Sequence, residues 1–178
     1  MPKLTKITHA ALLSLGLITT PFLANADSWQ TDTVLASQHS LKMADAITAA
    51  KRHVVGDVLS VTFDDDNGGS YDVSIIADKT EHELSFSAVT GQLIKHEQER
   101  VQRSLAREHR AFKAAKLDLE TAQTAAVRAV GGGEVVGFEF DLEKRTPVYE
   151  VDVLHNAQLK KVRIHANTGA VLSQRLDD

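Results

Sequence analysis

The clearest capacity for chemistry in this sequence lies in basic side chains. The segment KHEQERVQRSLAREHRAFKAAK, residues 95–116, holds seven basic and three acidic residues in a chain whose formal net charge is −4. At 100° per residue, one side of a helix over this segment would gather Arg100, Arg103, Arg107 and Arg110. The other side would carry an apolar seam of Ile94, Val101, Leu105 and Phe112. We therefore expect an amphipathic helix here.

The arginine side of this helix has two interpretations. It either keeps a packed helix solvated, as charged runs usually do, or it docks on an acidic surface. Such a surface would belong to a partner protein or to anionic lipid headgroups. These four arginines are the predicted partner-binding residues.

Two other groups of residues invite a metal hypothesis but lack the spacing for a metal site. DDDNGG, residues 64–69, clusters carboxylates, yet the twelfth residue counted from Asp64 is Ile75, where an EF-hand needs a bidentate glutamate. A hairpin turn is the better interpretation of this segment. The seven histidines after residue 26 form none of the close pairs of a zinc motif. We expect neither a metal nor another cofactor.

Recognisable catalytic groups are also missing from the sequence. The chain has no cysteine, no G-x-S-x-G elbow and no HExxH motif. The triple glycine at residues 131–133 lacks the rest of any nucleotide-binding fingerprint. We therefore expect no catalytic residue and no enzymatic activity.

Residues 1–26 have the features of a secretory signal peptide. Lys3 and Lys6 precede the apolar stretch HAALLSLGLITTPFL, and Ala24, Asn25 and Ala26 offer small residues for cleavage. We expect a periplasmic or secreted protein without a transmembrane segment after cleavage, and without a cysteine for lipid attachment. Cleavage would leave 18 basic and 24 acidic side chains. The resulting charge of −6 argues against nucleic acid as the partner.

The rest of the chain repeats itself. An offset of 78 residues matches Tyr71 with Tyr149 and VTGQLI, residues 89–94, with NTGAVL, residues 167–172. Upstream, an offset of 77 matches Leu59 with Val136. The segments before these match at an offset of 78, or at an offset of 76 that aligns AITAA with AQTAA. The duplication is therefore clear, while the register of its first segment stays open.

Both copies predict the same order of elements. A polar cap, Ser40 or Asp118, precedes an alanine-rich amphipathic helix that ends at Gly56 or at the triple glycine. Alternating apolar residues then predict strands, and the links between them are too short for parallel crossovers. The expected fold class is α+β. It has two repeated units, each with one helix packed on a three- or four-stranded antiparallel sheet, joined by the charged amphipathic helix.

This pattern resembles the PepSY domain, an exported module named after peptidase propeptides. The resemblance rests on GDVLSVTF, YDVSI and VTGQLI in the first copy and on GEVVGFEF, YEVDV and NTGAVL in the second. Family members commonly carry an acidic residue before the Thr-Gly turn, whereas this chain has Ala88-Val89 and His165-Ala166-Asn167. The resemblance implies a non-catalytic role in binding or restraining proteins such as peptidases.

We therefore divide the chain into a signal peptide (1–26), an N-terminal arm (27–39), a first repeat (40–98), a linker helix (99–116) and a second repeat (117–178). The function expected is that of a non-catalytic exported binding module that inhibits or regulates a peptidase or another cell-envelope protein. The alternative is a sensor that binds a small molecule or a metal between the two repeats. The identity of the partner, the orientation of the repeats and the oligomeric state are left open by the sequence.

Overall fold

A computed structural model describes residues 41–64 and 68–176 of the chain. The predicted signal peptide, the N-terminal arm and the Ser40 cap lie outside the described residues, as do residues 65–67 of the predicted hairpin turn. The fold below is that of the two repeats and the segment between them.

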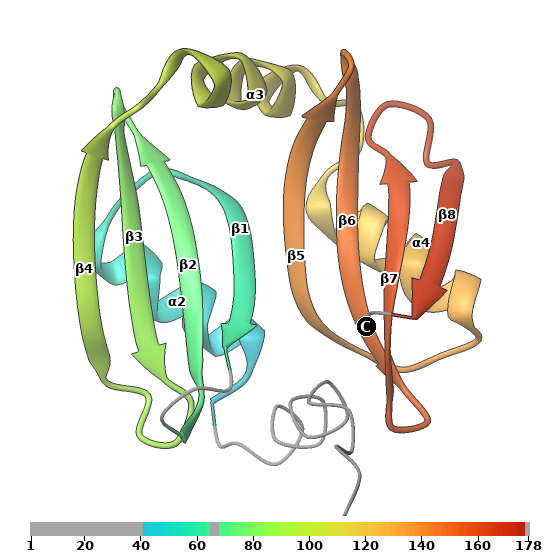
Figure 1. The fold of residues 1–178 in the computed structure, drawn as a ribbon, viewed down its shortest axis with the longest axis horizontal. Helices are drawn as coiled ribbons and strands as arrows, with labels where there is room; N and C mark the ends of the chain where they lie inside the picture. Colours follow the sequence, from blue (N-terminus) through green and yellow to red (C-terminus); the bar gives the residue numbers. More distant parts are fainter. Residues whose placement is uncertain (1–40, 65–67, 177–178) are drawn as a thin grey trace, which may run out of the picture.

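The described chain has the α+β composition expected from the sequence (Figure 1). The first repeat contains α2 (Met43–His53), β1 (Asp57–Asp64), β2 (Ser70–Ala77), β3 (Thr80–Ser87) and β4 (Leu93–Arg100). A connecting helix, α3 (Arg103–Ala114), follows. The second repeat contains α4 (Leu119–Val130), β5 (Glu134–Glu143), β6 (Thr146–His155), β7 (Gln158–His165) and β8 (Val171–Leu176). Each repeat is thus one helix and four antiparallel strands.

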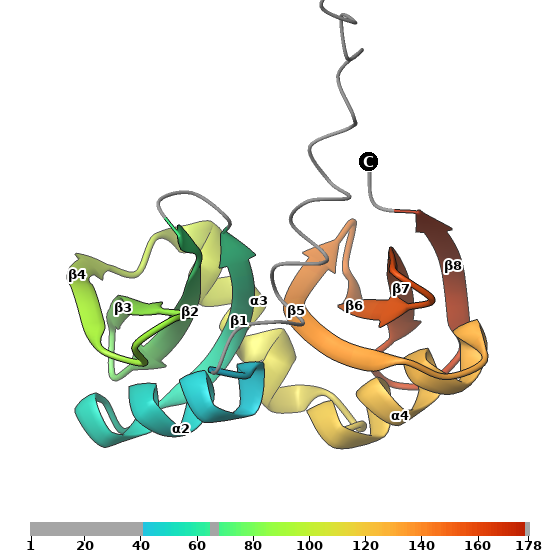
Figure 2. The ribbon, with the colours of Figure 1, turned by 90° about the horizontal axis from the view of Figure 1, so that it is seen from below.

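The two repeats share a single sheet, a feature that the sequence left open. Its strand order is β4-β3-β2-β1-β5-β6-β7-β8. The first strand of each repeat lies at the centre of the sheet, and the last strand of each repeat lies at an edge. The central joint is short, since β1 and β5 pair antiparallel only at Ser60 with Glu139 and at Val61 with Phe138. Figure 2 shows α2 and α4 side by side on one face of this sheet. We call the opposite face the open face.

Irregularities in the strands confirm the duplication. Leu59 in β1 and Val136 in β5 are both extra residues where the ladder to the next strand shifts. Ile94 in β4 and Leu172 in β8 are a second matching pair of bulges. Because a bulge sets the local bend and twist of its strand, both halves of the sheet curve in the same way.

The helices pack on the sheet through alanines. Ala46 and Ala50 of α2 and Ala122 and Ala126 of α4 are fully buried, which lets each helix approach the strands closely. These residues correspond at an offset of 76, so the structure settles the helix register in favour of the AITAA and AQTAA alignment. Beneath the helices, burial raises the pKa of the equivalent residues Tyr71 and Tyr149 to about 12.

The predicted turn and cap residues are largely confirmed. Gly91 and Gly169 of the Thr-Gly phrases have φ values of 70° and 74°, a left-handed conformation that favours glycine. Asp118 caps α4, because its Oδ1 accepts a hydrogen bond of 2.8 Å from the Thr121 amide. Gly131 ends α4 in the left-handed conformation.

The role predicted for Gly56 is wrong, and its true role is shared with Gly133. Helix α2 ends at His53 with Val54 as its C-cap, so Gly56 does not cap it. A Cβ atom on Gly56 would lie 2.5 Å from the Ile76 carbonyl oxygen, and one on Gly133 would lie 2.5 Å from the Leu154 carbonyl oxygen. Both glycines therefore allow the chain to pass a neighbouring strand as it enters the sheet.

We predict that Gly56→Ala and Gly133→Ala each lower the free energy of unfolding by about 1–3 kcal/mol, because the new methyl group must displace backbone. Gly133→Ala should cost more, since its φ of 120° also disfavours a side chain. Gly131→Ala, at a φ of 87° with open space around it, isolates the conformational cost. Urea unfolding of the three variants measures these values, and wild-type stability of Gly56→Ala would contradict the steric explanation.

Candidate partner-binding surface

The predicted arginine surface is present on α3 but is smaller than expected. Arg103, Arg107 and Arg110 lie on the exposed side of the helix. Among residues 41–64 and 68–176, no ion pair engages their guanidinium groups. These three residues, which we call the arginine stripe, are therefore available to a partner.

Helix α3 is shorter than the predicted linker helix of residues 99–116, and the helical pattern drawn from residue 95 is wrong for residues 95–100. Residues 95–100 continue β4, whose ladder with β3 reaches from Leu93 opposite Phe86 to Arg100 opposite Thr80. Arg100 is therefore a strand residue and not part of the helical stripe. Ile94 is likewise not part of an apolar seam, because it is the bulge residue of β4 and is 63% exposed. Strand pairing with β3 outweighs the helical period of these charged residues.

An aromatic cluster fixes α3 on the second repeat. The ring of Phe112 meets that of Phe140 edge-on, with centroids 5.3 Å apart, and lies 6.5 Å from that of Tyr149. Such edge-to-face pairs add about 0.5–1.5 kcal/mol beyond the apolar area they bury. Tyr149 also donates a hydrogen bond of 3.1 Å to the Leu117 carbonyl, just past the end of α3. The helix cannot rotate without breaking these contacts.

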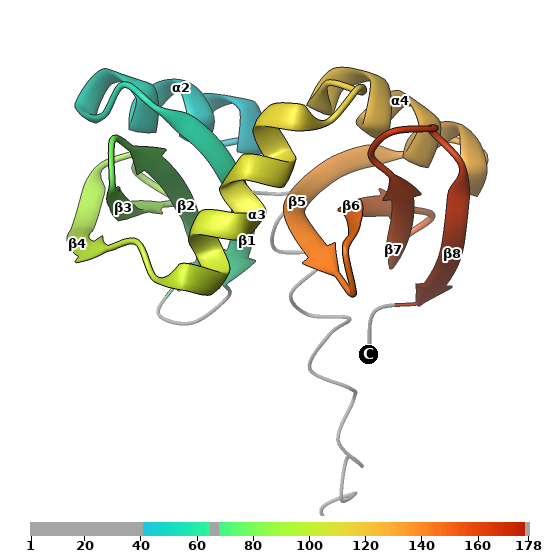
Figure 3. The same cartoon turned by 90° about the horizontal axis from the view of Figure 1, so that it is seen from above.

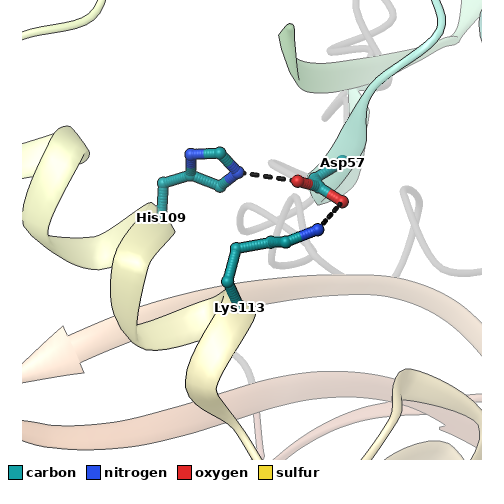
Figure 4. Close-up of polar contacts among 3 residues, drawn as sticks. All are labelled: Asp57, His109 and Lys113. Carbon is teal, nitrogen blue, oxygen red and sulfur yellow. Dashed lines mark hydrogen bonds and ion pairs between the residues drawn. The ribbon is translucent and has the colours of Figure 1, made fainter. Parts of the chain in front are cut away.

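A polar cluster fixes α3 on the first repeat (Figure 4). Asp57 lies at the start of β1. Its Oδ2 forms an ion pair with His109 Nε2 at 2.8 Å, and its Oδ1 forms one with Lys113 Nζ at 3.2 Å. Burial works to raise the pKa of Asp57, but the hydrogen bonds from His109 and Lys113 outweigh it and the pKa is lowered. Helix α3 thus holds both repeats, and Figure 3 shows it crossing the end of the β1–β5 joint. The arginine stripe is oriented by contacts on both sides.

The half-buried side of α3 also carries an acidic group in an unfavourable environment. Burial raises the pKa of Glu108 to about 7, and the nearby carboxylates of Asp141, Glu139 and Glu81 add to the effect. Because the unfolded state loses this proton near the ordinary value of 4.5, stability should fall as pH rises from about 4.5 to about 7. No sequence motif marks this group, because its acidic neighbours come from two strands, β3 and β5, that lie far apart in the sequence.

No metal centre is visible in the described part of the chain. It contains no group of three or more histidine, cysteine, aspartate or glutamate side chains that could hold a metal ion. His82 and His96 do face each other across β3 and β4, with Nδ1 and Nε2 3.1 Å apart. Burial lowers the pKa of His82, and His96 lowers it further. Two exposed imidazoles without a third ligand make a hydrogen-bonded pair.

The two edge strands of the sheet, β4 and β8, are a further exposed part of the molecule. All eight residues of β4 are exposed, and β8 is exposed except at Ser173. The edges carry the apolar side chains Leu93, Ile94, Val171, Leu172 and Leu176. An unpaired edge can accept an added strand. The Thr-Gly phrase at the start of each last strand could have located these edges.

We predict that Glu108→Gln raises the free energy of unfolding at pH 8 by about 1 kcal/mol, after allowance for solvent screening at a group only half buried. The gain should vanish near pH 4.5, where the wild-type carboxyl is also neutral. Glu120→Gln is the control, because Glu120 is exposed in the first turn of α4, where negative charge is favourable. Thermal melting from pH 4 to pH 8 checks the prediction, and a pH-independent difference would contradict it.

Comparisons with known proteins place the chain in a family. The model of the family described as "Peptidase propeptide and YPEB domain", or PepSY, matches residues 41–97 and 116–175. The chain is also similar to a crystal structure of a "putative lipoprotein" (CD1622) from Clostridium difficile 630. That likeness has a TM-score of 0.50 and 18% sequence identity, and it covers 82% of this chain and 99% of the other.

At that level of identity the structural likeness supports the fold alone. No curated protein matches the sequence. The two family matches coincide with the two structural repeats, each a helix on four antiparallel strands. The chain therefore belongs to the PepSY family, as a tandem of two PepSY domains.

Proposed function

We propose that this protein is a non-catalytic, exported binding module that captures another protein of the cell envelope, such as a peptidase, and restrains it. Its family is defined by peptidase propeptides, which supports a regulatory binding role. The interior of each repeat is filled by apolar side chains, so a partner would bind at the surface. The alternative of a metal sensor has no supporting ligand set in the described residues.

The observation that carries this proposal is the orientation of α3. Phe112 packs on the second repeat and His109 binds Asp57 of the first, so the opposite side of the helix is held toward solvent. That side presents Arg103, Arg107 and Arg110 at helical spacing. Guanidinium groups bind carboxylates in a planar, bidentate manner. An acidic patch on the partner would therefore match this surface.

Export is supported by the leader and not by the described residues. Residues 1–26 have the charge, apolar stretch and small residues of a secretory signal peptide. Within residues 41–64 and 68–176, no helix has the length and apolar character needed to cross a membrane. The structural neighbour is named as a lipoprotein, whereas this chain has no cysteine to which a lipid could be attached.

We predict that Arg103→Glu combined with Arg107→Glu abolishes capture of the partner, because two charges at the centre of the surface are reversed. The assay is a pull-down from envelope extract of the native host with identification by mass spectrometry. It is followed by titration of the purified partner and, for a peptidase, by its inhibition. Circular dichroism should be unchanged, since both side chains are exposed.

The matched control reverses the same charge elsewhere. Lys51→Glu combined with Arg52→Glu alters two exposed residues on α2, at the other side of the sheet from the open face. This control should capture the partner as the wild type does. Equal capture by the arginine-stripe variant and the wild type would refute the proposed surface.

A further inference from the structure

The open face differs between the two repeats at equivalent positions. In the second repeat, Glu150 lies directly opposite Arg163 across β6 and β7. Arg163 forms ion pairs with Glu143 and with Glu150, its Nε being 3.4 Å from Glu150 Oε1 but not aligned for a hydrogen bond. The side chains of Arg163 and Glu150 are only 26% and 20% exposed. Beside them, Val148 is completely buried. The second repeat therefore fills this part of its face.

The first repeat leaves the same place hollow. Asp72 stands at the position of Glu150, opposite Ser85 at the position of Arg163, and Ser70 replaces Val148. The result is a groove of about 590 Å³ lined by Asp64, Ser70, Asp72, Ser85, Ser87 and Lys95. This volume lies within the range of ~300–1,000 Å³ typical of small-molecule sites. Since the second repeat folds with the place filled, the fold itself does not require the groove.

Asp72 lacks the guanidinium partner that its counterpart Glu150 has in Arg163. Its Oδ1 is buried and has no hydrogen-bond partner among the described residues. A buried acceptor without a partner costs about 1–3 kcal/mol, and more for a charged group. In the second repeat the guanidinium of Arg163 forms an ion pair with the equivalent carboxylate, that of Glu150. In the first repeat Ser85 is too short to reach across and carries no charge.

We propose that the groove of the first repeat binds a guanidinium group supplied from outside, in the position that Arg163 occupies in the second repeat. The carboxylate of Asp72 accepts hydrogen bonds from two N–H groups of the guanidinium, in the guanidinium plane. The hydroxyl oxygens of Ser70 and Ser85 can accept hydrogen bonds from its remaining N–H groups. This assignment concerns a different surface from the arginine stripe of α3 and does not depend on the proposed function.

The charges around the groove favour a cation. On the open face of the first repeat the neighbouring strands β3 and β4 place Glu81 opposite Glu99 and Glu83 opposite Glu97. The equivalents of Glu83 and Glu97 in the second repeat are Lys161 and Arg175, so these two positions carry the opposite charge there. Among the described residues that line the groove, Lys95 is the one with a basic side chain. Its Nζ forms an ion pair with Glu97 at 2.9 Å, and its charge also interacts with those of Glu83 and Asp72.

The chemistry of the lining also excludes the other simple ligands. An anion would meet the carboxylates of Asp64 and Asp72. A hard divalent cation prefers six or more oxygen ligands with several carboxylates, and no metal-holding group of three acidic or histidine side chains occurs in the described chain. A planar, weakly hydrated guanidinium suits a mixed lining of two carboxylates and several hydroxyls better than an ammonium does.

The test is a titration of the ¹⁵N-labelled protein with methylguanidinium, and with acetyl-Ala-Arg-Ala-amide, followed by NMR. We expect shifts of the amides around Ser70, Asp72 and Ser85, with a dissociation constant on the order of 1 mM for the single charged group. The citrulline peptide of the same shape should cause no such shifts. Similar affinity for both probes would indicate a free guanidinium compound as the ligand, and at least tenfold tighter binding of the peptide would indicate an arginine side chain of a protein segment.

Three variants make the test decisive. Asp72→Asn should weaken binding at least tenfold, and Ser85→Arg should abolish it while raising the melting temperature, because the new arginine supplies the missing partner from within. Lys95→Gln should bind at least as tightly as the wild type, since the ammonium opposes a second cation. Glu150→Gln is the control in the second repeat and should leave binding unchanged.

The inference is overturned if neither probe shifts these amides, or if Asp72→Asn binds as the wild type does. It is also overturned if Ser85→Arg folds and retains wild-type affinity. The arginine-stripe variant, Arg103→Glu with Arg107→Glu, should bind both probes normally. Loss of the proposed partner and loss of the guanidinium site can therefore be told apart.

Discussion

The structure depends on a joint of two residue pairs between β1 and β5. Each repeat alone would present the first strand of its sheet as an open edge, with unpaired amides and carbonyls. Pairing these two edges with each other makes one eight-stranded sheet and buries Phe138 of the second repeat in the core of the first. Because so short a ladder would twist easily, the bracing of α3 by Asp57 on one side and Phe140 on the other becomes essential. The same bracing turns the arginine stripe outward.

The two repeats share the residues that shape the fold and differ in residues that face solvent. The bulges at Leu59 and Val136, the buried alanines of α2 and α4, and the close-approach glycines Gly56 and Gly133 occur in both repeats. On the open face the residue types differ between the repeats, since Ser85 and Glu83 stand at the positions of Arg163 and Lys161. A tandem protein can therefore carry two differently charged surfaces on one rigid sheet.

Much of the fold was predictable because its determinants are local. The alternation around Tyr71 and Tyr149, the cap at Asp118 and the Thr-Gly corners at Gly91 and Gly169 each need only neighbouring residues to be recognised. The structure of residues 95–100 was not predictable in this way, because their charged pattern suits a helix and only pairing with β3 makes them a strand. For the same reason the β1–β5 joint, the environment of Glu108 and the hollow beside Asp72 could not be foreseen, since each is formed by strands distant in the sequence.

The joint can be tested most directly by cross-linking, because the chain contains no cysteine of its own. Residues directly opposite in an antiparallel pair have Cα atoms about 4.5–5.5 Å apart, within the range that a disulfide spans. Ser60→Cys with Glu139→Cys should therefore oxidise to an intramolecular disulfide as readily as Ser60→Cys with Ser74→Cys, a pair within the first repeat. Ser74→Cys with Glu139→Cys, separated by β1, should not. Failure of the Ser60 and Glu139 pair to cross-link while the Ser60 and Ser74 pair does so would show that the two repeats do not share one sheet.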